Sequence, residues 1–180
     1  MKNYILSLDQ GTTSSKAILV DEKANIVAIS QKEITQIYPQ EGWVEHDPIE
    51  ILNSIKEVIK NVINENNIDH KNIAGIGITN QRETSVLWDK DTGIPIHNAI
   101  VWQDTRTTNI CKDLKQKNLE KEISSKTGLL IGPYFSATKI KWLLENNETA
   151  KSKLKEGKLL FGTIDSWLIW NLTKEKYNLT

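Results

Sequence analysis

The sequence is poor in the features that mark secreted, membrane and nucleic-acid-binding proteins. It has one cysteine, Cys111, in 180 residues, so no internal disulfide can form. No apolar run is long enough to cross a bilayer, and Asp9 interrupts the only short apolar run near the N-terminus, which argues against a signal peptide. The formal net charge is +0, from 23 basic and 23 acidic side chains, so no overall field attracts nucleic acid or acidic lipid. We therefore expect a cytoplasmic protein that neither binds nucleic acid nor inserts into a membrane.

The residue types that usually bind metals are also sparse. The three histidines, His46, His70 and His97, share no metal-ligand spacing, so we interpret them as surface or structural residues. Cys111 lies in a predicted helix and is interpreted as a packing residue.

The order of predicted elements runs from strands to helices. An antiparallel meander over 4–8, 16–20 and 26–34 precedes a helix with Asp47 as N-cap, Pro48 in its first turn and Glu50 bonding back to the cap. The apolar run 73–78 predicts a strand covered on both faces. Residues 85–88 and 99–102 are predicted to form a hairpin, and residues 158–162 a strand. One predicted helix runs through Leu114, a second ends near Thr127 with Gly128 as its stop, a third covers 136–146, and a fourth follows Thr163. This pattern predicts an α/β domain with a mixed sheet and flanking helices.

The first segment with chemical potential follows the N-terminal strand. Asp9 is predicted at the rim of the sheet, where a carboxylate can hold hydrated Mg²⁺. Gly11 allows a tight turn, and the hydroxyls that follow offer donors to phosphate oxygens: Thr12, Thr13, Ser14 and Ser15. The alternative is an ordinary polar hairpin turn.

A second polar segment, 79–84, follows the predicted strand 73–78. Arg82 can donate to one hydroxyl of a small polyol while Glu83 accepts from another. The alternative is a solvated turn with an accidental charge pair. Trp102 comes after another predicted strand and can pack on the carbons of a small ligand, or serve only as core. A rigid turn at 132–135 can aim the Tyr134 hydroxyl at the same ligand.

These segments resemble the glycerol kinases of the FGGY carbohydrate kinase family along essentially the whole chain. The matching segments are Asp9-Gln10-Gly11-Thr12-Thr13-Ser14-Ser15, Asn80-Gln81-Arg82-Glu83-Thr84, Trp102-Gln103-Asp104, Pro133-Tyr134-Phe135-Ser136 and Gly162-Thr163-Ile164-Asp165-Ser166-Trp167-Leu168. The resemblance implies an RNase H-like domain of the type found in actin, hexokinase and the heat-shock ATPases. It also implies transfer of the ATP γ-phosphoryl group to a terminal hydroxyl of glycerol, giving sn-glycerol 3-phosphate.

The resemblance assigns roles to matching positions only. It implies that Thr12, Thr13, Ser14 and Lys16 bind the nucleotide, and that Asp9 lies by Mg²⁺, through water. Arg82, Glu83 and Tyr134 are then expected to bind the glycerol hydroxyls, with Trp102 against its carbons. Two positions depart from the family pattern: Lys16 and Thr105 stand where arginine is common. Lysine keeps the charge but lacks the bidentate fork, so nucleotide affinity can differ.

The same resemblance implies that residues 1–180 are the N-terminal part of the first of two domains. The expected catalytic Asp base, the second domain and the adenine pocket would then lie beyond Thr180, and the chain alone would be inert. Whether the full-length protein is a homo-oligomer stays open. Three alternative functions also stay open: a kinase for another polyol or sugar, a non-catalytic actin-like ATP-binding module, and a pure interaction domain.

Overall fold

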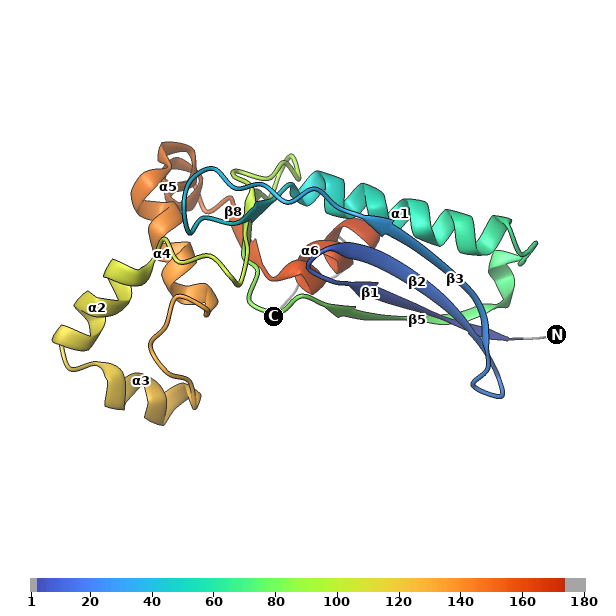
Figure 1. Ribbon diagram of the computed structural model, residues 1–180. Coiled ribbons are helices and arrows are strands. Elements are labelled where there is room, and N and C mark those ends of the chain that lie inside the picture. The colour runs from blue at the N-terminus through green and yellow to red at the C-terminus, as the bar shows by residue number, and fades with distance from the viewer. Residues whose placement is uncertain (1–2, 174–180) are drawn as a thin grey trace. The chain divides into compact units, whose positions relative to one another are not determined.

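The computed structural model describes residues 3–173 and divides them into two compact units. Unit 1 holds the described residues up to Gln36, His46–Gln81 and the described residues from Ile164 onward, whereas unit 2 holds Ile37–Glu45 and Arg82–Thr163. Figure 1 labels the helices α1 to α6 and the strands β1, β2, β3, β5 and β8.

A four-stranded mixed sheet forms the frame of unit 1, with the order β3-β2-β1-β5. Strands β1 (Tyr4–Gln10), β2 (Ser14–Asp21) and β3 (Ile26–Glu33) form the predicted antiparallel meander, and β5 (Ile73–Asn80) runs parallel to β1. Along β1 and β2, buried and partly exposed residues alternate, because successive side chains of a strand point to opposite faces.

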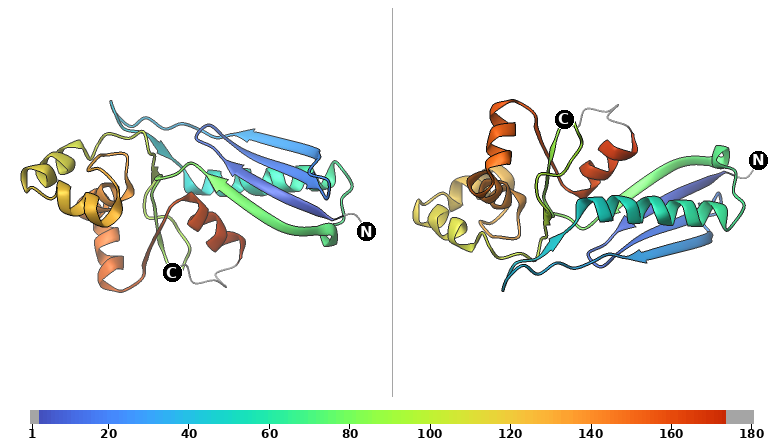
Figure 2. Two further views of the ribbon diagram at one scale, coloured as in Figure 1. Left: turned by 90° about the horizontal axis from the view of Figure 1, so that it is seen from below. Right: turned by 90° about the horizontal axis from the view of Figure 1, so that it is seen from above.

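Helix α1 (Pro48–Asn64) covers one face of this sheet. Figure 2 shows it behind the strands from below and in front of them from above. Its buried stripe at helical spacing includes Ile51, Ile55 and Val58. The Asp47 side chain accepts from the Ile49 N–H, as predicted for an N-cap. The prediction for Glu50 was wrong, because its carboxylate accepts from the backbone and hydroxyl of Thr35 instead of bonding back to the cap.

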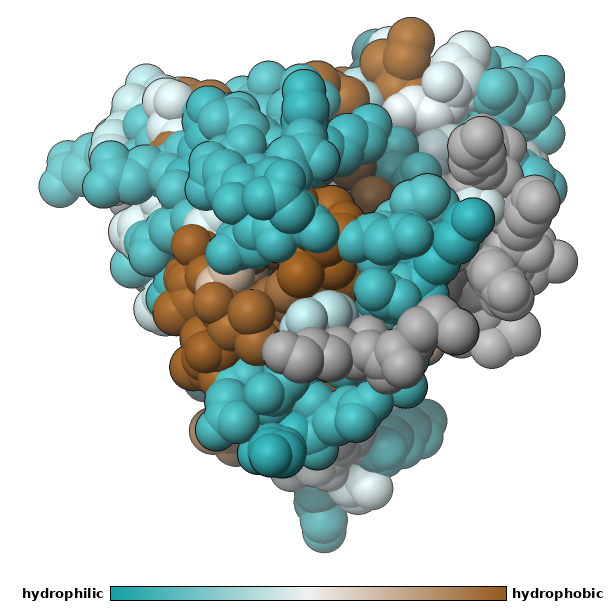
Figure 3. All heavy atoms as spheres, turned by 90° about the vertical axis from the view of Figure 1, so that its right-hand side faces the viewer, coloured by the Kyte–Doolittle hydropathy of each residue, from teal (hydrophilic) through white to brown (hydrophobic). Residues whose placement is uncertain are grey.

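The prediction that residues 73–78 are covered on both faces was also wrong for the described part of the chain. Strand β5 lies at one end of the strand order, and Ile76 is 55% exposed. Ile5 on the neighbouring strand β1 and Ile29 on β3 are also about half exposed. Figure 3 shows apolar side chains gathered on the side of the molecule that it views.

Two shorter elements complete unit 1. A 3₁₀ turn, η1 (His70–Asn72), leads into β5. Helix α6 (Ile164–Leu172) begins one residue after Thr163, and its Trp167 donates from Nε1 to the Pro48 carbonyl of α1 at 2.9 Å. This bond satisfies the indole N–H of a fully buried ring.

Unit 2 combines short strands with four helices. Strand β6 (Val86–Asp89) pairs antiparallel with β8 (Leu159–Gly162), and β7 (Ala99–Ile100) pairs with β4 (Glu45–His46). The helices are α2 (Thr108–Gln116), α3 (Glu120–Thr127), α4 (Ser136–Asn146) and α5 (Glu148–Lys155). A core of Leu87, Ile100, Leu143 and Ala150 joins β6, β7, α4 and α5. As predicted, α3 ends at Gly128, whose φ of 73° is left-handed.

The structure therefore confirms the predicted α/β class, with a mixed sheet and flanking helices. Among residues 3–173, no helix is long and apolar enough to span a bilayer.

Candidate phosphate and polyol sites

The predicted phosphate loop is the turn between β1 and β2. Asp9 lies within β1, one residue before the strand ends, and not after it. It is the direct ladder partner of Lys16 on β2, so the two opposite charges share one face of the sheet. That face lies opposite α1, because the neighbouring residues Leu8 and Ala17 are fully buried on the helix side.

Three successive carbonyl groups of this turn are hydrogen-bonded within unit 1. The Gly11 carbonyl accepts from Gln10 Nε2 at 2.8 Å, and the Thr12 carbonyl accepts from Gln36 Nε2 at 2.9 Å. The Thr13 carbonyl accepts from the Ile34 N–H at 3.0 Å. Carbonyl oxygens would repel phosphate, and these bonds pair all three oxygens with protein donors instead. Glycine suits position 11, since a Cβ there would lie 3.3 Å from the Ser14 carbonyl.

A buried histidine joins Gln36 to a third glutamine, Gln81. His46 is fully buried; its Nε2 donates to Gln36 Oε1 at 2.8 Å, and its Nδ1 accepts from Gln81 Nε2 at 3.1 Å. Gln81 also donates to Gln10 Oε1 at 3.0 Å. Burial lowers the pKa of His46 to about 4, although Glu50 opposes this shift. The ring is therefore neutral at pH 7, the state in which it can donate to one glutamine and accept from the other.

Glu83 has the most unusual backbone among the predicted polyol residues. Its φ is +64°, a left-handed conformation that a residue with a Cβ seldom adopts. Its Oε2 accepts from the Ser136 N–H at 2.9 Å and from the Ser136 hydroxyl at 2.8 Å. Both bonds come from the first residue of α4, where a negative charge is also favoured by the helix dipole.

The two predicted aromatic residues lie together in unit 2. The rings of Trp102 and Tyr134 meet edge-on with centroids 5.9 Å apart, and Phe135 packs against Tyr134 at 5.1 Å. Tyr134 is 40% exposed, so its ring remains accessible beside the partly buried Trp102. Arg82 is exposed. The structure thus places Arg82, Glu83, Trp102 and Tyr134 in one unit, with Trp102 and Tyr134 in direct contact.

A fully buried lysine supports the turn that carries Tyr134. Lys139 Nζ donates to the carbonyl groups of Pro133 at 2.7 Å and Tyr134 at 2.6 Å, and Phe135 lies at 3.5 Å. Burial lowers the pKa of Lys139 to about 8, while Asp104 and then Glu83 favour its charged form. The side chain is therefore an ammonium ion at pH 7.

The segment after Trp102 is fixed by a buried ion network. Arg106 Nε lies 3.0 Å from both carboxylate oxygens of Asp104, and its Nη2 lies 2.7 Å from Glu45 Oε1. The guanidinium carbon stacks 3.8 Å from the ring centroid of Trp43 and 4.7 Å from that of Trp142. Such a network holds a backbone in one arrangement more than it adds net stability.

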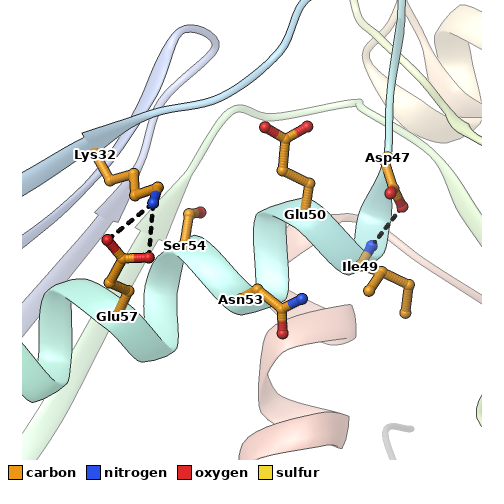
Figure 4. Close-up of a pocket in the computed structure, with 7 residues that line it drawn as sticks. All are labelled: Lys32, Asp47, Ile49, Glu50, Asn53, Ser54 and Glu57. Atoms are coloured by element: carbon orange, nitrogen blue, oxygen red, sulfur yellow. Dashed lines mark hydrogen bonds and ion pairs between the residues drawn. The ribbon is translucent and has the colours of Figure 1, made fainter.

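A separate groove in unit 1 contains none of the predicted site residues. It runs beside the first turns of α1 and is lined by Lys32, Asp47, Ile49, Glu50, Asn53, Ser54 and Glu57, as Figure 4 shows. Lys32 Nζ lies 2.7 Å from Glu57, and Asp47 caps the helix. Because the lining holds three carboxylates and a single lysine that is already paired with Glu57, the groove is unsuited to phosphate.

Comparisons with known proteins identify the family of this chain. The model of the FGGY family of carbohydrate kinases, N-terminal domain, matches residues 4–178. The chain belongs to the FGGY family of carbohydrate kinases. It is 58% identical to a glycerol kinase of Clostridium perfringens over 181 residues and 55% identical to that of Azotobacter vinelandii over 179 residues. These matches cover 100% and 99% of this chain, which spans only 36% and 35% of the two relatives.

Solved structures show that the fold is shared within the FGGY family. A Plasmodium falciparum glycerol kinase with ADP matches 96% of this chain with a TM-score of 0.92 and 42% identity. A ligand-bound xylulose kinase from Lactobacillus acidophilus matches 94% with a TM-score of 0.81 and 28% identity. The chain covers 35% and 33% of those two chains. These matches confirm the predicted fold class.

The FGGY chain offers little protein ligation for a metal ion. Among residues 3–173, no group of three or more His, Cys, Asp or Glu side chains could hold one. Asp9 supplies a single carboxylate beside the turn, which fits a hydrated Mg²⁺ that takes its remaining ligands from water and phosphate.

Sequence reasoning missed the residues of this FGGY chain that support the predicted site. Gln36, His46 and Gln81 hold the turn after β1, whereas Ser136 and Lys139 hold Glu83 and the turn at Tyr134. Their partners are backbone groups or side chains that can lie far away in sequence, with separations of 53 residues for Ser136 and Glu83 and 71 for Gln81 and Gln10. A polar residue in the sequence does not identify a partner at such a distance.

Proposed function

We propose that the full-length protein transfers the γ-phosphoryl group of ATP to a terminal hydroxyl of glycerol, giving sn-glycerol 3-phosphate. The observation that carries the proposal is the match of the whole chain, at 58% identity, to a protein named glycerol kinase. Two local geometries support it. The carbonyl groups after β1 are bonded to glutamine side chains, and in unit 2 the Glu83 carboxylate is fixed by Ser136 while the rings of Trp102 and Tyr134 are in contact.

On the nucleotide side, Thr12, Thr13 and Ser14 would bind phosphate oxygens through hydroxyl and amide groups. Lys16 would add a positive charge on the sheet face that it shares with Asp9. Phosphoryl transfer depends mainly on positioning and on neutralising the charge of the phosphates. Mg²⁺, when bound, would supply part of that neutralisation, with Asp9 holding it through water.

On the acceptor side, Glu83 would accept a hydrogen bond from one glycerol hydroxyl. Its Oε2 is already held by Ser136, so Oε1 is the oxygen left for the ligand. Arg82 would donate to a second hydroxyl, and the Tyr134 hydroxyl would complete the polar contacts. Trp102 would pack against the carbon atoms.

We further propose that this chain is the N-terminal part of the first of two kinase domains and is inert alone. Its span of about 36% of the relative supports this, because most of the relative's length has no counterpart in the chain. The Asp that would act as general base, the second domain and the adenine pocket would then lie beyond Thr180.

Glycerol 3-phosphate formation tests both proposals. With MgATP and glycerol, the full-length protein is expected to form this product, and the purified 180-residue chain is expected to form none. Robust turnover by the short chain would contradict its assignment as an inert part. Failure of the full-length protein to phosphorylate glycerol would contradict the proposed function.

A kinase for another polyol or sugar is the second candidate. It is favoured by the likeness to the xylulose kinase and to a gluconate kinase from Lactobacillus acidophilus, which matches with a TM-score of 0.82 and 27% identity. A non-catalytic ATP-binding module would make no use of Arg82. Replacing Arg82 with alanine in the full-length protein would then leave activity and binding unchanged.

We also propose a cytoplasmic location and no binding of nucleic acid. The single cysteine supports a reducing compartment, and the balance of 23 basic and 23 acidic side chains gives no overall attraction to phosphate backbones. A homo-oligomer of the full-length protein is compatible with these features.

A further inference from the structure

The first turn of α4 contacts the segments that carry Glu83 and Tyr134 and the segment that follows Trp102. Ser136 bonds to Glu83, and Lys139 bonds to the turn that carries Tyr134. The Thr138 hydroxyl lies 2.9 Å from the Thr107 hydroxyl, in the segment that follows Trp102. One helical turn therefore joins segments that lie more than 20 residues apart in sequence.

At the start of α4, the Glu83 carboxylate accepts the hydrogen bond that an N-cap side chain would usually accept. The N-cap residue of this helix is Phe135, which makes no side-chain cap hydrogen bond. Without such an acceptor, the first N–H groups of a helix need another partner. The Glu83 carboxylate accepts from the Ser136 N–H and hydroxyl, and the Glu83 carbonyl accepts from the same hydroxyl at 3.2 Å.

Lys139 is placed where a lysine is energetically unfavourable. It lies in the first turn of a helix, where the helix dipole disfavours a positive charge, and it is fully buried. Its ammonium group is directed to the carbonyl groups of Pro133 and Tyr134, two positions on the rigid turn before the helix. An apolar side chain of similar length would fill the same space but would leave these two carbonyl groups without that donor, so the lysine holds the turn in a way that packing alone would not.

We propose that Ser136 and Lys139 are positioning residues for the polyol: Ser136 sets the direction of the Glu83 carboxylate, and Lys139 fixes the backbone that aims Tyr134. This inference rests on the proposed glycerol kinase activity. Neither side chain needs to touch the substrate. Because both act on unit 2 residues only, their loss should weaken polyol binding and leave nucleotide binding unchanged.

The test uses Lys139→Met and Ser136→Ala in the full-length protein, with KM measured for glycerol and for ATP. We expect the KM for glycerol to rise about tenfold or more in Lys139→Met, because charge-assisted hydrogen bonds are lost. The expected rise in Ser136→Ala is smaller, about threefold to tenfold, because the backbone N–H still binds Glu83. The KM for ATP should stay within about twofold of the wild-type value in both variants.

Lys141→Met is the matched control. Lys141 lies two residues further along α4, is half exposed and pairs with Glu145, so this variant should leave both KM values unchanged. If Lys139→Met fails to fold, Ser136→Ala alone carries the test. Unchanged KM for glycerol in active enzyme, or an equal rise of both KM values, would overturn the inference while leaving the proposed function intact.

A double-variant cycle separates positioning from general destabilisation. If Lys139 acts by aiming Tyr134, Lys139→Met should add little to the KM for glycerol in a Tyr134→Phe background. Independent, multiplying effects in the two backgrounds would contradict this role. A wild-type protein without glycerol kinase activity would instead contradict the proposed function.

Discussion

Glu83 combines a backbone conformation that is unfavourable with a side chain that is held in place. A left-handed residue other than glycine costs of order 1 kcal/mol and persists only when its surroundings fix it. The bonds from Ser136 to the carboxylate provide this fixation. At the residue scale, Glu83 is therefore the strongest candidate for direct contact with the acceptor.

Replacing Glu83 with glutamine in the full-length protein should reduce kcat/KM for glycerol about tenfold to a hundredfold. The amide oxygen can still accept from Ser136, so the loss reports the missing negative charge toward the substrate hydroxyl. Steady-state kinetics with varied glycerol would measure it. Glu41→Gln, at an exposed residue, is the control and should leave kcat/KM unchanged. An unchanged value for Glu83→Gln would remove Glu83 from the acceptor site.

His46 predicts a pH dependence of stability. Burial lowers its pKa from 6.5 to about 4, so between these pH values the unfolded state binds more protons than the folded state. Stability should therefore fall as pH decreases from about 6.5 to about 4, by at most about 1.4 kcal/mol per pH unit from this group.

Denaturant unfolding at several pH values checks this prediction. The variant His46→Asn should lose less stability than the wild type across that window, whereas His70→Asn, at a largely exposed histidine, should behave like the wild type. Equal slopes for His46→Asn and wild type would contradict a buried neutral His46. The same variant should raise the KM for ATP in the full-length protein, because Gln36 and Gln81 would lose their shared partner.

At the element scale, helix α1 covers the sheet of unit 1 and begins next to His46, one of the residues that support the turn after β1. Its N-terminus follows directly after His46, and its cap is the Asp47 side chain. Replacing Asp47 with alanine should lower the free energy of unfolding by about 1 kcal/mol, because one N–H group loses its acceptor. Asp113→Ala, at an exposed position of α2, is the control for the loss of one surface carboxylate. Equal stability of both variants would contradict a capping role for Asp47.

Local signals predicted most elements because their causes lie within a few residues. The alternation in β1 and β2, the Asp47-Pro48 start of α1 and the Gly128 stop of α3 are all local, and the structure has each of them. The Glu50 prediction failed because a tertiary partner, Thr35, binds its carboxylate. Helix α5 was missed, although Asn147 caps it through the Ala150 N–H, because its short polar sequence lacks a clear apolar stripe.

At the scale of the whole molecule, the proposed nucleotide residues and the proposed acceptor residues belong to different units. The turn after β1 and its supporting glutamines belong to unit 1, whereas Arg82, Glu83, Trp102 and Tyr134 belong to unit 2. The segment 79–84 passes from one unit to the other between Gln81 and Arg82. Short motifs gave the candidate ligand-binding residues, and these remain predictions. Sequence motifs could not predict the partners of Ser136, Lys139 or His46, since those contacts form only in the folded chain.

A prediction for the isolated chain follows from this division. If the turn after β1 binds phosphates by itself, the 180-residue chain should bind MgADP weakly while producing no glycerol 3-phosphate. Calorimetric titration would detect this binding, and Thr13→Ala at the exposed threonine of the turn should weaken it several-fold through the loss of one hydroxyl contact. Equal affinity of this variant would contradict a phosphate contact at Thr13.

The acceptor preference of the full-length protein tests the central claim most directly. The measurement is kcat/KM with MgATP for glycerol, xylulose and gluconate, side by side at one pH. The fixed Glu83 carboxylate and the Trp102–Tyr134 pair, together with the match to glycerol kinases, predict the highest value for glycerol. A higher value for either sugar substrate, or no phosphorylation of glycerol, would contradict the account.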